Sequence, residues 1–194
     1  MGAKLLAMAF FKPPPPQPPS GPRQPVLHEW DEPDDSLGRE APLQFVIARS
    51  HAAIVAVRRI TAYHNGFAFE VSVRLLPGHE LTDPSDFFGV RALRRTHDGL
   101  PDELFRFGLE FADGSTVTSL EVTGIGGPTR PRGPILAGGG GGGGDRRFDM
   151  RYWVWPLPPP GKLTFLSEWP AQGLALTRRE IDTEPIRNAA EGPV

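Results

Sequence analysis

The chain has 194 residues, with no cysteine, 23 glycines, 23 prolines and a formal charge of −2. A weakly acidic chain lacks the basic surface of a general nucleic-acid binder, and the absence of cysteine excludes disulfides and thiolate metal sites. No apolar run approaches the roughly 20 residues that a membrane helix needs, so we expect a cytoplasmic protein that binds neither membrane nor nucleic acid.

Residues 1–41 are predicted to form a Pro-rich, acidic tail. The run KPPPPQPPSGPRQP favours polyproline II, because each proline fixes φ and lacks an N–H donor. Such a run can dock into an aromatic-lined groove of a partner, although a stiff, solvated tail is the simpler interpretation. Trp30 lies in the acidic segment HEWDEPDDSLGRE. We expect Trp30 to anchor the tail to its own domain or to a partner.

Residues 42–184 are predicted to form one β domain. LQFVIAR is a strand, and AIVAVRRITAYHNGFAFEVSVRLLP is a hairpin with a type I′ turn at Asn65-Gly66. After this turn apolar and polar residues alternate, so the sequence places Val71 on the inner face of a half-buried strand. LFRFGLEFADGSTVTSLEV is a second hairpin, which turns at Asp113-Gly114.

A flexible loop is predicted near residues 124–146, where seven glycines follow one another at 138–144. Poly-Gly has high chain entropy and no side chains to bury, so these residues are expected to act as a tether. Three strands follow: RRFDMRYWVWPL, KLTFLSEW and LALTRREID. Residues 185–194 are expected to be a tail or a short helix starting at Pro185. About eight strands without a long helix predict an all-β, antiparallel β-sandwich of the immunoglobulin-like type.

The strand at 147–155 becomes apolar on both faces toward its end. One face carries Phe148, Met150, Tyr152 and Val154, and the other carries Asp149, Arg151, Trp153 and Trp155. If the second face is exposed, the two indoles form a stacking platform for sugars or bases; if it is covered, they pack against Pro-rich segments. We favour the packed arrangement. The candidate binding residues are Trp30, Arg151, Trp153, Trp155 and Trp169.

The sequence contains no recognisable catalytic or cofactor motif. The glycine run lacks GxxxxGK[ST], no serine lies in GxSxG, and the five histidines form no HExxH. We therefore expect no enzyme activity, no cofactor and no metal site. The function predicted first is a protein-interaction or scaffold module with a protein partner. The alternative is a module that binds carbohydrates or small ligands through its aromatic platform.

Several segments resemble a family of short proteins from actinobacteria. They are RYWVWPLPPPG, LTFLSEWPAQGL, the glycine run before them, RITAYHNGFAFEVSVRL, LFRFGLEFADG and HEWDEPDDSLG. The resemblance covers most of the chain, and its Trp-Pro motifs are the specific part. It implies no activity, cofactor or catalytic residue.

Overall fold

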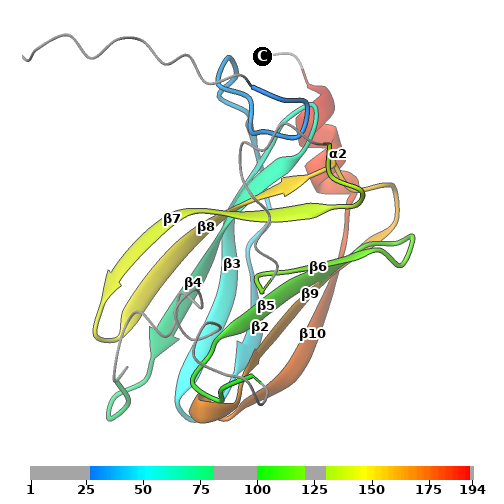
Figure 1. Cartoon of the computed structure of the whole chain (residues 1–194). Helices are drawn as coiled ribbons and strands as arrows, with labels where there is room; N and C mark the ends of the chain where they lie inside the picture. Colours follow the sequence, from blue (N-terminus) through cyan, green and yellow to red (C-terminus); the bar gives the residue numbers. More distant parts are fainter. Residues whose placement is uncertain (1–26, 81–99, 121–129, 193–194) are drawn as a thin grey trace, which may run out of the picture.

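Two antiparallel sheets pack face to face in the computed structural model, which describes residues 27–80, 100–120 and 130–192 (Figure 1). This arrangement confirms the predicted all-β, antiparallel sandwich. The immunoglobulin-like type stays a prediction. Residues 1–26, which hold the proline run of the predicted tail, lie outside the described residues.

The larger sheet has the strand order β1-β3-β4-β8-β7, and β2 pairs with the same side of β3 as β1. Its strands are β1 (Arg39–Ala41), β2 (Phe45–Arg49), β3 (Ala53–Ala62), β4 (Phe67–Leu75), β7 (Ile135–Gly144) and β8 (Arg147–Trp155). Strand β1 falls inside the predicted tail 1–41. The tail boundary is corrected accordingly, because residues 39–41 pair with the end of β3.

The smaller sheet has the order β10-β9-β5-β6. Its strands are β5 (Arg106–Glu110), β6 (Thr116–Thr118), β9 (Lys162–Trp169) and β10 (Leu174–Asp182), and the 3-10 turn η1 (Pro170–Gln172) joins the last two. Helix α2 (Glu184–Glu191) follows β10 and contacts β1 and β3 at one end of the sandwich (Figure 1). The short helix expected around Pro185 is confirmed.

The core lies between the inner faces of the two sheets. Phe69 of β4 links them, because its ring centroid is 5.7 Å from that of Phe107 in β5 and 5.4 Å from that of Phe165 in β9. Val71, two positions after Phe69, is fully buried. The face assignment from the alternating pattern of β4 is therefore confirmed.

The hairpin between β3 and β4 has a different turn from the predicted one. The N–H of Tyr63 donates to the carbonyl of Gly66 at 2.8 Å, but neither Asn65 nor Gly66 is among the described residues with positive φ, so the turn is not type I′. Gly66 has another use. A Cβ at this position would lie 2.6 Å from the ring of Trp153, so only glycine allows β8 to come this close.

The seven glycines form most of an edge strand. Residues 138–144 continue β7 and pair with β8, with a register shift between Gly138 and Gly141. A Cβ on Gly141 would lie 2.6 Å from the carbonyl oxygen of Asp149, and one on Gly143 would overlap the carbonyl oxygen of Arg147. The predicted loop near 124–146 is thus wrong for residues 135–144, because backbone pairing with β8 outweighs the chain entropy of glycine. Residues 121–129 lie outside the described part.

Candidate functional site

The outer face of the larger sheet carries a second apolar cluster, separate from the core. Its buried members are Trp30, Tyr63, Ala68, Ile135, Ala137, Trp153 and Trp155. All except Trp30 come from β4, β7 or β8, or, for Tyr63, from the position directly after β3. Since odd-numbered positions of β8 point outward, Trp153 and Trp155 lie side by side on this face and give the cluster two of its three tryptophan side chains.

The segment before β1 covers this cluster. Trp30 inserts its ring and is only 9% exposed, while the ring of His28 stacks on it with centroids 4.6 Å apart. Trp153 and Trp155 are 5% and 8% exposed. The two indoles therefore do not form the exposed stacking platform on which the alternative function depended. They are covered by HEWDE of the chain itself, so the self-docking predicted for Trp30 is confirmed.

Three successive backbone carbonyls of the segment are held by side chains of the sheet. Asn65 donates through Nδ2 to the carbonyl oxygens of Glu29 and Asp31, at 2.8 and 2.9 Å. Trp153 donates through Nε1 to the carbonyl oxygen of Trp30 at 2.8 Å. These bonds fix an irregular stretch of backbone to the sheet, and they satisfy the indole N–H that burial would otherwise leave without a partner.

An ion pair holds the end of the segment. The guanidinium of Arg151 donates to both carboxylate oxygens of Glu32, with one bond of 2.6 Å, and Tyr63 lies beside the same carboxylate. Burial raises the pKa of Glu32, but these hydrogen bonds and the charge of Arg151 together bring it below its ordinary value. The hydrogen bond to Glu32 raises the pKa of Arg151, and burial beside that carboxylate raises the pKa of Tyr63.

A second, weaker ionic contact lies near Trp155. Arg130 donates to the carboxylate of Glu29 at 3.2 Å, and its guanidinium carbon lies 5.8 Å from the ring centroid of Trp155. Both side chains of the ion pair are more than half exposed, so solvent screens the pair and it adds little to stability.

Four of the five predicted binding residues come together here: Trp30, Arg151, Trp153 and Trp155. Trp169 does not, because it lies on the inner face of β9, fully buried against Phe105 with ring centroids 5.6 Å apart. Its Nε1 donates to the carbonyl of Glu103 at 2.8 Å. Sequence reasoning missed Asn65, Tyr63 and Glu32. Asn65 was assigned only to a turn and Glu32 only to an acidic run.

The described residues show no further chemistry at this surface. They contain no group of three or more histidine, aspartate or glutamate side chains that could hold a metal ion. None of the helices that they form has the length and hydrophobicity to cross a lipid bilayer. Comparisons of the chain with protein-family models, curated proteins and solved structures found no match.

Proposed function

We propose that this chain is a cytoplasmic protein-interaction module whose binding surface is the outer face of the larger sheet around Trp153. The observation that carries the proposal is the capture of three successive backbone carbonyls of residues 29–31 by side chains of the sheet. In peptide recognition, contacts to the main chain supply affinity, while pockets for side chains supply specificity. The segment His28 to Glu32 has the position of a peptide ligand that belongs to the chain itself.

Two side-chain contacts would set the sequence preference of this surface. The ring of Trp30 fills the apolar cluster, and the carboxylate of Glu32 receives both branches of the Arg151 guanidinium. Bidentate pairs of this kind select a carboxylate by geometry as well as by charge. A partner would therefore carry a bulky aromatic residue with a glutamate two positions later.

The chain's own segment competes with any partner for this surface. Only residues 33–38 separate it from β1, and a linker of this length gives an effective concentration on the order of millimolar. A partner peptide would thus bind the intact chain weakly. It would bind more tightly when contacts of the resident segment are removed.

The experiment uses a fluorescent peptide with the sequence of residues 27–35 and the full chain carrying Trp30→Ala. We expect saturable binding by fluorescence anisotropy, at least about tenfold tighter than to the unmodified chain, because the competing anchor is gone. The matched control is the same peptide with alanine in place of its tryptophan. A second chain variant, Glu32→Lys, frees Arg151 by charge repulsion while keeping Trp30.

Two results would contradict the proposal. One is the absence of peptide binding to both variants while circular dichroism shows them folded. The other is equal binding of the control peptide, which would mean that the aromatic cluster does not recognise the ligand. Adding Arg151→Ala to either variant should also weaken binding, since the peptide then loses the partner of its glutamate.

A further inference from the structure

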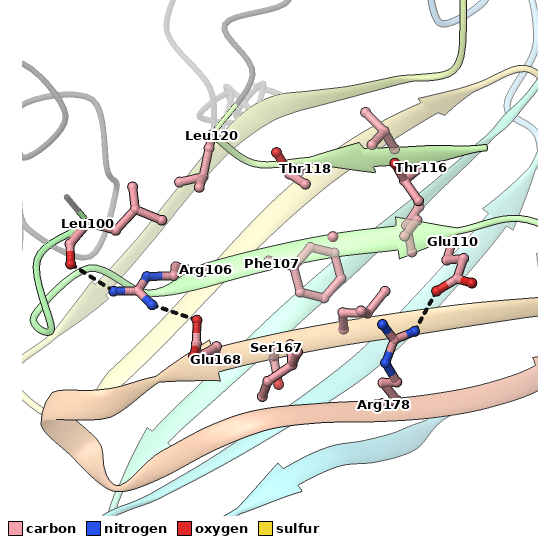
Figure 2. A pocket seen from close by; sticks show the side chains of 15 residues that line it. Leu100, Arg106, Phe107, Glu110, Thr116, Thr118, Leu120, Ser167, Glu168 and Arg178 are labelled. Atoms are coloured by element: carbon pink, nitrogen blue, oxygen red, sulfur yellow. Dashed lines mark hydrogen bonds and ion pairs between the residues drawn. The ribbon is translucent and has the colours of Figure 1, made fainter. Parts of the chain in front are cut away.

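The outer face of the smaller sheet contains a shallow apolar groove of about 340 Å³ (Figure 2). Gly108 of β5 lies at its floor. Its apolar side chains that are at least partly exposed are Leu100, Leu120, Leu166 and Leu176. Leu176 is 57% exposed and Leu100 is 44% exposed, so two large apolar side chains of the groove face solvent.

The groove exists because the central outward position of β5 has no side chain. Gly108 pairs with Thr118 of β6 on one side and with Leu166 of β9 on the other. On this face Gly108 lies between the outward residues Arg106 and Glu110 of its own strand. Gly108 itself is buried, and a Cβ there would lie 3.0 Å from the carbonyl oxygen of Val117, so the result is a shallow depression beside Leu166.

Ion pairs border the groove at both ends. Arg106 donates to Glu168 at 2.5 Å and also to the carbonyls of Leu100 and Pro101, each at 3.0 Å (Figure 2). Toward the other end Arg178 of β10 pairs with Glu110 of β5. Each end therefore presents both signs of charge, and opposite charges on a partner surface favour association there.

We propose that this groove is a weak dimer interface, occupied by the same face of a second copy of the chain. A two-fold axis parallel to the strands, between β5 and β9, lays β5 of one chain over β9 of the other. Leu166 then packs over the shallow depression at the partner's Gly108, and Arg106 faces the partner's Glu168. The same axis places Leu120 opposite the partner's Leu176. The end with Arg106 and Glu168 therefore meets its own opposite charges, while Arg178 lies opposite the partner's Thr118 and Glu110 opposite the partner's Thr164.

The size of the face sets the strength of the dimer. The four strands have three to nine residues, and at ~4.8 Å between strands and ~3.4 Å per residue they cover on the order of 400 Å² per chain. Stable dimers bury about 800 Å² per partner. We therefore expect a reversible dimer with a Kd of roughly 10 µM to 1 mM.

Sedimentation at rising concentration of the full chain tests the association. We expect a monomer–dimer equilibrium that Leu176→Asp weakens at least about tenfold, because the symmetry places a new carboxylate against the partner's Leu120 in each of two equivalent apolar contacts. The matched control is Val46→Asp, which adds the same charge at a 45% exposed position of the other sheet and should leave the equilibrium unchanged. A monomer up to about 1 mM, or a dimer that Leu176→Asp does not weaken, overturns the proposal.

Cross-linking tests the geometry. Because the chain has no cysteine, Leu120→Cys and Leu176→Cys each introduce a single thiol. The proposed axis brings residue 120 of one chain next to residue 176 of the other. It keeps the two copies of either residue three strand spacings apart, about 14 Å, which is beyond the ~7 Å reach of a disulfide. A mixture of the two variants should oxidise to mixed dimers faster than either variant alone.

Equal rates in the mixture and in the single variants overturn the proposed axis. Slow reaction of the Leu176→Cys thiol with a small reagent in the dilute monomer overturns the proposal in another way. It would mean that the groove is already covered within one chain, for example by residues 81–99, and is not open to a second copy.

Discussion

Trp153 donates a hydrogen bond of 2.8 Å from its indole Nε1 to the carbonyl oxygen of Trp30, although 123 positions separate the two residues. Trp30 belongs to the same buried cluster as Trp153, which is 5% exposed. Removing the segment would leave a buried donor without an acceptor, at a cost of about 1–3 kcal/mol, and would expose the ring as well. The burial of Trp153 and the docking of the segment that carries Trp30 therefore depend on each other.

Replacing Trp30 with alanine should lower the free energy of unfolding by about 3 kcal/mol, because it removes a large, buried side chain. The emission of the remaining tryptophans should shift to the red as Trp153 and Trp155 become hydrated. Urea denaturation followed by fluorescence measures both effects. Leu37→Ala, on the same segment but 91% exposed, is the control and should change stability by less than about 0.5 kcal/mol. Identical curves for the two variants would contradict the docked arrangement.

Alanine substitutions within the glycine run should alternate in effect. Gly141→Ala and Gly143→Ala should destabilise by about 1–3 kcal/mol, because the added Cβ meets carbonyl oxygens of β8. Gly142→Ala and Gly144→Ala have open space within 4 Å and should change stability by less than about 1 kcal/mol. Thermal denaturation of the four variants distinguishes them. Four equal melting temperatures would mean that the run is not a paired strand.

Val71→Asp should unfold the protein or nearly so. The substitution places a carboxylate without a partner at a fully buried position in the middle of β4. The expected loss is several kcal/mol, comparable with a typical domain stability of about 5–15 kcal/mol. Calorimetry gives the melting temperature, with Val46→Asp as an exposed control for the same chemical change. An unchanged melting temperature for Val71→Asp would refute the inner-face assignment.

Acid should weaken the docking of the N-terminal segment through Glu32. Its folded-state pKa lies below the ordinary 4.5, so the stabilisation is fully present above about pH 4.5 and is lost as pH falls through the folded-state pKa. The melting temperature of Glu32→Gln should differ from that of the unmodified chain by a constant amount between pH 8 and pH 5, and the difference should narrow below about pH 4.5.

The pair of Glu32 and Arg151 is partly exposed, so its contribution stays at or below about 1 kcal/mol. Arg151→Gln should flatten the pH dependence of stability in the same window, because it removes the main cause that lowers the pKa of Glu32. A pH profile of either variant that parallels the unmodified one would show that this carboxylate is not held in the folded state.

The strands that alternate in hydrophobicity could be predicted, and those without such a pattern could not. In β4, Phe69 and Val71 alternate with polar residues because one face is buried more than the other. Strand β7 has no comparable signal, since residues 138–144 have no side chains. Strand β1 is short, and two of its three residues are exposed. Its pairing with β3 is a tertiary contact that local pattern does not encode.

The candidate site was predicted as far as its tryptophans allow. Trp30, Trp153 and Trp155 could be predicted as candidates because a large aromatic side chain in an acidic segment, or on the second face of a strand, is stabilised by packing against another segment. Trp169 was a candidate too, since it also precedes a proline, but its position in β9 puts it on the inner face. Asn65 and Glu32 act through partners 34 and 119 positions away, respectively. Contacts at such separations leave no trace in the neighbouring sequence.

The long sequence separation between the N-terminal segment and the sheet that binds it also means that the two are synthesised at different times. A ribosome completes Trp30 well before Arg151 and Trp153, which follow 121 and 123 positions later. At ~5–20 residues per second this interval lasts about 6–25 s. Throughout it the nascent chain displays a tryptophan flanked by acidic residues with no sheet to receive it. A cellular protein that binds such a segment therefore has access to it on the nascent chain before the chain's own sheet has formed.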